Sequence, residues 1–98
     1  MNQYMIEFVI VENPDSLFFD LIPEQRAKIN QLMSEGKIIS YSLNEFRTKL
    51  WCIVNAKSEF DVFDMISSFP LINYMTPSIS QLMFHNSVFL SIPKFSVN

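Results

Sequence analysis

The sequence predicts an α+β fold of the ferredoxin-like type, in which β-α-β-β-α-β elements place two helices on one face of a four-stranded antiparallel sheet. Two observations support this prediction. Strand-like and helix-like patterns follow one another in that order, and a five-residue link of hairpin length joins the two middle strands. The chain has 98 residues, which is the length of one domain. We therefore interpret residues 1–98 as a single domain, with 88–98 as a C-terminal extension.

The first strand is predicted over residues 3–12, because "QYMIEFVIVE" is rich in β-branched and aromatic residues and precedes the turn-forming "NPDS". Alternate side chains of a strand point to opposite faces. Tyr4, Ile6, Phe8 and Ile10 therefore share one face. The other face carries Met5, Glu7, Val9 and Val11, so that both faces are apolar apart from Glu7. Such a strand is expected to be covered on two sides.

The first helix is predicted to begin near Pro23 and to end at Gly36, the only glycine of the chain. Proline suits the first turn of a helix, and glycine readily takes the left-handed conformation that ends one. Its apolar stripe is predicted to contain Ala27, Ile29, Leu32 and Met33. The preceding residues 16–22 are too apolar for a free loop, and we expect an irregular turn there.

The two middle strands are "KIISYSL" (37–43) and "KLWCIVNA" (49–56), and they are expected to pair antiparallel. Ser58 is then a predicted N-cap with Asp61 three residues later. Phe60, Phe63, Ile66 and Phe69 recur at helical spacing, and Pro70 is expected to stop this second helix. Period-two alternation over 77–85 predicts the last strand, which ends in His85. Another short strand-like piece precedes Pro93.

The sheet face without helices is predicted to be apolar. Leaving it in water would cost on the order of 1 to 2 kcal/mol for each large side chain, so a second copy is expected to cover it. The sequence thus predicts a homodimer in which two sheets form a dimeric α+β barrel, and leaves a higher assembly of dimers open. The predicted open face contains Met5, Val9, Val11, Trp51, Ile53, Ile79 and Met83.

Composition narrows the classes of partner. The formal charge is −3 with seven scattered Lys and Arg residues, so no positive stripe is available for nucleic acid. No apolar run approaches the roughly 18 residues of a membrane span, and the first residues lack the pattern of a signal peptide. A cytoplasmic protein is the expectation. Cys52 is the only cysteine, which excludes an intramolecular disulfide, and its apolar neighbours indicate a buried small hydrophobe.

The segment "SSFPLINYMTPSISQLMFHNS" resembles the muconolactone delta-isomerase family. The resemblance is carried by Phe69-Pro70-Leu71, by Tyr74-Met75 and by a last strand closed by His85; Glu35-Gly36 matches the family's helix end. It implies a dimeric α+β barrel and a cofactor-free enzyme of aromatic catabolism, which moves a double bond within a small lactone by proton transfer. Such chemistry needs a base and a group that stabilises an enolate.

Five side chains are candidates for the site, each with an alternative. His85 and Glu7 are the catalytic candidates, as a proton shuttle and as a base raised in pKa by burial. Alternatively, His85 bonds to backbone at a strand end and Glu7 pairs with a Lys or Arg. Arg26 is a candidate for binding a ligand carboxylate, or else lies on a solvated helix face. Tyr41 and Trp51 could line the substrate pocket or pack in the core or interface.

Other ionisable residues are given no catalytic role. Arg47 is interpreted as hairpin surface, and one histidine without a carboxylate cluster makes a metal site an unfavoured reading. Where the family has an adjacent carboxylate and lysine in the first helix, this chain has Gln25 and Arg26. A second hypothesis is therefore a non-catalytic barrel for small-molecule binding or assembly. Two or more ionisable groups converging on a cavity would favour catalysis, and a cavity filled by Phe side chains would favour assembly.

Overall fold

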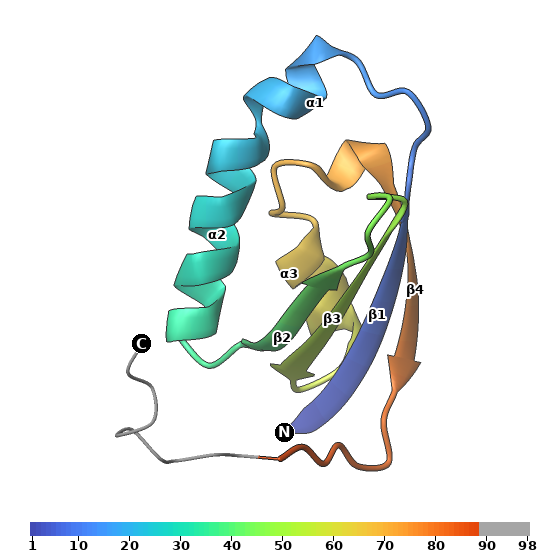
Figure 1. Ribbon diagram of the computed structural model, residues 1–98. Helices are drawn as coiled ribbons and strands as arrows, with labels where there is room; N and C mark the ends of the chain where they lie inside the picture. Colours follow the sequence, from blue (N-terminus) through green and yellow to red (C-terminus); the bar gives the residue numbers. More distant parts are fainter. Residues whose placement is uncertain (89–98) are drawn as a thin grey trace, which may run out of the picture.

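The chain alternates strands and helices in the predicted order. The computed structural model describes residues 1–88 (Figure 1). Its elements are β1 (Asn2–Ile10), α1 (Ser16–Asp20), α2 (Ile22–Ser34), β2 (Ile38–Leu43), β3 (Lys49–Ala56), α3 (Glu59–Ile66), the 3-10 turn η1 (Ile72–Tyr74) and β4 (Met75–Gln81). The short helix α1 occupies the segment for which an irregular turn was expected. The predicted extension (88–98) and its strand-like piece lie outside the described residues, apart from Val88.

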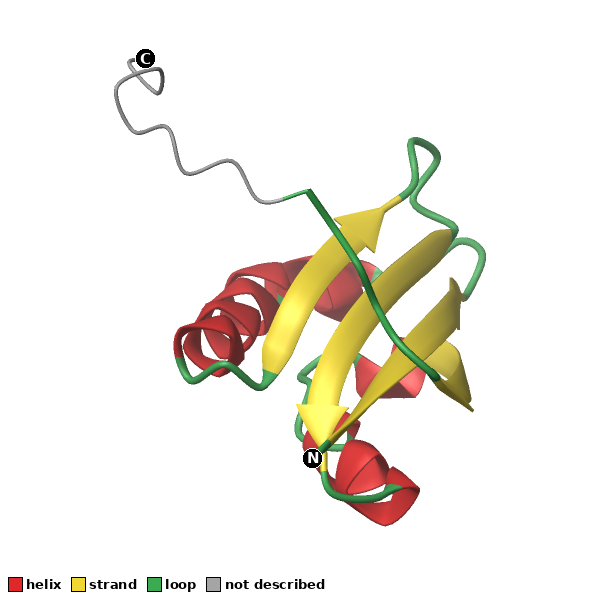
Figure 2. Cartoon of the chain, turned by 90° about the horizontal axis from the view of Figure 1, so that it is seen from below, coloured by secondary structure: helices red, strands yellow, loops and turns green. Residues whose placement is uncertain are grey.

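The four strands form one antiparallel sheet in the order β2-β3-β1-β4. Ile6 at the middle of β1 lies opposite Cys52 of β3 and Ile79 of β4, and these three side chains share a face because paired residues of a sheet point the same way. The helices gather on one side of the sheet (Figure 2). The predicted α+β fold with a four-stranded antiparallel sheet is confirmed.

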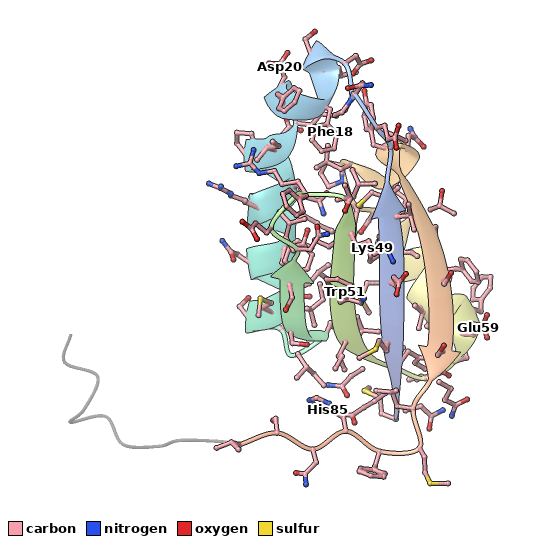
Figure 3. All side chains as sticks on the ribbon, turned by 45° about the vertical axis from the view of Figure 1, so that its right-hand side comes forward. Phe18, Asp20, Lys49, Trp51, Glu59 and His85 are labelled. Atoms are coloured by element: carbon pink, nitrogen blue, oxygen red, sulfur yellow. The ribbon has the colours of Figure 1, made fainter. Side chains whose placement is uncertain are left out.

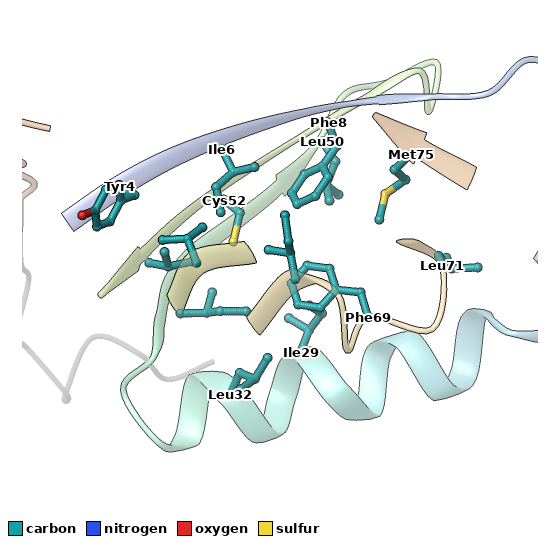
Figure 4. Close-up of a cluster of buried hydrophobic side chains, with 14 of the residues drawn as sticks. Tyr4, Ile6, Phe8, Ile29, Leu32, Leu50, Cys52, Phe69, Leu71 and Met75 are labelled. Carbon is teal, nitrogen blue, oxygen red and sulfur yellow. The ribbon is translucent and has the colours of Figure 1, made fainter. Parts of the chain in front are cut away.

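The core lies between the sheet and the two longer helices (Figure 4). The predicted inner face of β1 is buried along its whole length, and the rings of Phe8 and Phe69 are 5.9 Å apart. Cys52 is fully buried, as its neighbours indicated, and burial raises the pKa of its thiol to about 12. The thiol therefore stays protonated and packs as a small apolar group.

Local signals set the helix ends. The Ser58 hydroxyl accepts a hydrogen bond from the Asp61 N–H at 3.2 Å, so the predicted N-cap of α3 is confirmed. Gly36 has φ +75° just after α2, and the next N–H, that of Lys37, donates to the Leu32 carbonyl at 2.9 Å. This is the left-handed helix ending that glycine adopts at least cost.

The buried stripes of both helices differ from the predicted ones. In α2 the buried residues are Gln25, Ile29 and Leu32, whereas Ala27 and Met33 are exposed. Positions separated by four and three residues lie on one face, and the true stripe starts at a polar residue that the apolar pattern passed over.

In α3 the prediction was wrong at Phe60 and Phe63, which are exposed, while Val62 and Ile66 are buried. The predicted stripe advanced by three residues at each step, and each step falls about 60° short of a full turn. After three steps the accumulated difference is about half a turn. Phe60 and Phe69 therefore could not share one face, and α3 in fact ends at Ile66, before Phe69.

The last strand is shorter than predicted and faces the other way. It ends at Gln81, so that Met83 and His85 lie beyond it. Ile79 faces the helices with Ile6, and it was wrongly placed on the open face. That face instead carries Thr76, Ser78 and Ser80 of β4, whose register partners are Val9, Glu7 and Met5.

Val11, also predicted on the open face, lies just beyond β1. Period-two alternation had separated the two sets of side chains of the last strand, but it does not say which set faces the core. The chain after β4 passes the end of the sheet where β1 begins (Figure 1), and the Leu82 N–H donates to the Gln3 carbonyl at 2.8 Å. Within residues 1–88 no helix is long and apolar enough to cross a membrane.

Candidate active site

A cavity of about 710 Å³ opens at the end of the sheet where β1 stops. Its walls are the β1–α1 loop, α1, the first turns of α2, the β2–β3 hairpin and the start of β4. A volume of this size suits a small-molecule ligand. The lining residues that carry polar or aromatic groups are Glu12, Asn13, Phe18, Phe19, Gln25, Arg26, Tyr41, Phe46, Arg47 and Thr48.

Hydrogen bonds of Asn44 hold the hairpin wall of the cavity. Its Oδ1 accepts from the N–H groups of Thr48 at 2.8 Å and Lys49 at 2.9 Å, and its Nδ2 donates to the Thr48 hydroxyl. The turn also places Arg47 at φ 59°, a left-handed conformation that is rare outside glycine. The hairpin that brings Phe46 and Arg47 to the cavity is thus fixed by side-chain bonds to the backbone.

The opposite wall, α1, is pinned to the turn before β4. The Tyr74 hydroxyl donates to the Asp15 carboxylate at 2.8 Å, and the rings of Phe18 and Tyr74 meet edge to face at 5.2 Å. The bond to Asp15 raises the pKa of Tyr74, since it favours the protonated phenol. Phe18 in turn meets Phe19 edge to face, and both rings line the cavity.

The polar floor of the cavity is built by three segments distant in sequence. Gln25 is only 4% exposed, and its Oε1 accepts from the Leu71 N–H at 3.0 Å. Its Nε2 donates to the Tyr41 hydroxyl at 3.1 Å. Burial raises the pKa of Tyr41, and the bond from Gln25 opposes this rise. Tyr41 is therefore a neutral phenol at physiological pH.

Three exposed charged side chains surround this floor. Arg26 extends from the start of α2, Arg47 from the hairpin and Glu12 from the loop after β1. The structure thus brings together Arg26 and Tyr41, two of the five candidates. Arg47, interpreted as hairpin surface, is exposed and also lines the cavity. Two guanidinium groups from separate elements offer bidentate donors to an anionic ligand.

Glu7 and Trp51 lie together on the helix-free face of the sheet, and neither lines the cavity. Figure 3 labels Trp51 and Lys49 on the sheet. The Trp51 Nε1 donates to Glu7 Oε1 at 3.2 Å, and the Lys49 Nζ lies 3.6 Å from Glu7 Oε2. Glu7 thus pairs with a lysine, which is the alternative to its predicted role as a base.

His85 is half-buried in the segment that follows β4. Figure 3 places it past one end of the sheet, whereas Phe18 of the cavity wall lies at the other end. The five candidates therefore occupy three separate places: Arg26 and Tyr41 in the cavity, Glu7 and Trp51 on the open sheet face, and His85 beyond β4.

Gln25 and Glu12 line the cavity but are not among the five candidates, and Gln25 was noted only as the residue that stands where the family has a carboxylate. Gln25 had a usable signal, because it precedes Ile29 and Leu32 by four and seven residues and so falls on the buried stripe of α2. A polar side chain at such a position needs buried hydrogen-bond partners. Glu12 had no comparable signal, since only the chain reversal after β1 brings it to the cavity.

Comparisons with known proteins agree with this architecture. A family model described as Muconolactone delta-isomerase matches residues 4–88. A crystal structure of muconolactone isomerase superposes with a TM-score of 0.70 at 16% sequence identity, covering 91% of this chain and 96% of that one.

A second solved structure is similar to the same extent. It is a 5-chloro-2-hydroxyhydroquinone dehydrochlorinase from Burkholderia phenoliruptrix in complex with 2,5-dihydroxybenzoquinone, and it superposes with a TM-score of 0.71 at 13% identity. The match covers 85% of this chain and 95% of that one. No curated protein sequence matches this chain. At these identities the structural likeness concerns the fold.

Proposed function

This chain belongs to the muconolactone delta-isomerase family, and from that premise we propose that it isomerises a small carboxylated, lactone-like metabolite by moving a double bond. The observation that carries the proposal is the convergence of Glu12, Arg26, Arg47 and Tyr41 on one cavity. Clustered ionisable groups around a concave site favour catalysis. Phe18, Phe19 and Phe46 line this cavity without filling it, which disfavours a purely structural use.

The proposed reaction is a proton transfer between two carbons. Glu12 removes a proton from the carbon at the far end of the conjugated system, and the electron pair moves through the double bond onto the carbonyl oxygen to form a dienolate. The protonated Glu12 then returns the proton to the carbon next to the carbonyl group, so the double bond has moved and the product has the same atoms as the substrate. Arg26 and Arg47 bind the substrate carboxylate and stabilise the added negative charge.

Muconolactone is the first ligand to test, followed by its methyl ester. We expect the protein to bind muconolactone and to convert it at a rate proportional to protein concentration, as followed by proton NMR. The ester should bind roughly tenfold more weakly, since it lacks the charge that the arginines recognise. Binding without conversion would support the alternative of a non-catalytic ligand-binding barrel. If the protein neither bound nor converted muconolactone, both proposals would be contradicted for this ligand class.

We also propose that a second copy covers the helix-free face of the sheet. Met5 and Val9 of the central strand β1 are 37% and 48% exposed there, and Trp51 of β3 is half-buried on the same face, whereas Ile53 beside Met5 is already buried within one chain. The polar residues of β4 reduce the apolar area, yet the central strands keep most of their large side chains. Pairing two such faces would bury these groups and leave the cavities open at the strand ends.

Light scattering after size-exclusion chromatography tests the dimer. At micromolar concentration the wild-type particle should have twice the 11.5 kDa mass of one chain. Val9→Lys should shift it toward the single-chain mass, because a charge would be buried in the interface. Leu17→Lys is the matched control: Leu17 is similarly exposed on α1, away from that face, and its variant should remain dimeric. A wild-type monomer would contradict the proposal.

A further inference from the structure

The orientation of the Gln25 amide follows from its backbone partner. Oxygen and nitrogen of a glutamine amide are otherwise assigned from the hydrogen-bond network. The Leu71 N–H can only donate, so the atom 3.0 Å from it must be the oxygen, Oε1. The nitrogen, Nε2, must then face Tyr41 at 3.1 Å. Because the amide is almost fully buried, a rotated arrangement would leave buried donors facing each other.

This orientation sets the direction of the hydrogen bond at Tyr41. Nε2 can only donate, and so the phenol oxygen accepts and its own proton must point elsewhere. Among residues 1–88 no acceptor receives that proton, since Gln25 is the hydrogen-bond partner of the hydroxyl and donates to it. Tyr41 lines the cavity. Its O–H group is thus free to donate to a molecule bound there.

We propose that Tyr41 is a specificity-determining donor and Gln25 a positioning residue, so that the site selects ligands presenting a carbonyl or anionic oxygen to Tyr41. The inference rests on the proposed function and names the substrate class more closely. Arg26 and Arg47 recognise one anionic end of the ligand, and the Tyr41 hydroxyl recognises a second, accepting oxygen. That oxygen becomes the enolate oxygen during proton transfer, when the bond to Tyr41 strengthens.

The identity of residue 25 decides this polarity. A glutamate there could accept from the Leu71 N–H with one oxygen and from the Tyr41 hydroxyl with the other. The Tyr41 hydroxyl would then donate its hydrogen bond to residue 25 and could only accept a hydrogen bond from the ligand. Glutamine at position 25 has the same shape but donates to Tyr41. A single nitrogen in place of oxygen thus separates a site for acceptors from a site for donors.

A double-mutant cycle with muconolactone tests whether Gln25 affects ligand binding through the Tyr41 hydroxyl. Tyr41→Phe should weaken binding roughly tenfold in the wild-type background, as measured by isothermal titration calorimetry. In the Gln25→Glu background the same change should alter the dissociation constant less than about twofold, because Tyr41 no longer donates to the ligand. A merely structural or charge effect of Gln25→Glu would leave the two changes additive. Additivity would overturn the proposal.

A measurement without ligand separates this proposal from the proposed function. A bond donated to the phenol oxygen favours the phenolate, whereas one accepted from the phenol favours its neutral form. Gln25→Met should therefore raise the pKa of Tyr41, as followed by NMR of tyrosine labelled with carbon-13 at the Cζ position. A lowered pKa would show that Gln25 accepts, and would overturn the proposal whether or not muconolactone binds.

Tyr4→Phe is the matched control for both measurements. Tyr4 lies in the core near the start of β1, at the opposite end of the strand from the cavity, and does not line it; the variant loses the same single oxygen as Tyr41→Phe. Muconolactone affinity and the Tyr41 pKa should both stay at their wild-type values. An equal loss of affinity in this variant would assign the Tyr41→Phe effect to a general loosening of the fold, and would count against a donor role for Tyr41.

Discussion

Replacing Phe69 with Ala is expected to lower the free energy of unfolding by roughly 3–5 kcal/mol. Phe69 is 1% exposed, packs against Phe8, and stands where the chain leaves α3 for the last strand. The loss is large because the surroundings can close only partly around the missing ring. A domain of this size has about 5–15 kcal/mol of total stability, so the variant should be only marginally folded.

Phe60→Ala is the matched control for that experiment. The substitution is identical, but Phe60 is 77% exposed on α3, and its loss should change stability by no more than about 0.5 kcal/mol. Urea unfolding by circular dichroism measures both variants, at one protein concentration because association would shift the midpoint. Equal destabilisation of the two variants would contradict the burial assigned to Phe69.

Replacing Glu12 with Gln is expected to reduce the turnover rate at least 100-fold, the usual loss when a general base is removed. The amide has the shape of the carboxylate but cannot take a proton from carbon. Since Arg26 and Arg47 hold the ligand in the proposed complex, the dissociation constant should change only a few-fold. Product formed from muconolactone in reactions quenched at successive times gives the turnover rate, and isothermal titration calorimetry gives the dissociation constant.

Glu45→Gln serves as the control for Glu12. Glu45 is an exposed acid of the β2–β3 hairpin and does not line the cavity. This variant therefore changes the net charge by the same amount as Glu12→Gln, but at a position outside the site. It should keep the wild-type rate. A Glu12→Gln variant that retained full activity would exclude Glu12 as the base.

The strand and helix order could be predicted because it depends on local signals. The Ser58 cap, the left-handed Gly36 and the hairpin at 44–48 are each decided by a few neighbouring residues, and all appear in the structure. The alternation in β1 was also sufficient, since Tyr4, Ile6, Phe8 and Ile10 are all buried. These features need no information about distant parts of the chain.

Which face an element turns to the core was predicted less well. The face of Ile79 depends on its pairing with Ile6, which is 73 positions away by their numbers, 79 − 6. The exposure of Phe60 depends on where the sheet lies relative to α3. Periodicity divides side chains into sets, but only packing against a partner decides which set is inside. A short segment with apolar residues on both faces leaves that choice open.

The candidate site shows the same division. The residues by themselves predicted an arginine and a tyrosine for ligand binding, and Arg26 and Tyr41 do line the cavity. The tertiary structure decided that Arg47 and Glu12 join them, that Glu7 pairs with Lys49 on the other sheet face, and that His85 lies past β4. The sequence shows which chemical groups the chain has. A cavity forms only where separate segments meet, and long-range strand pairing and burial decide which segments do so.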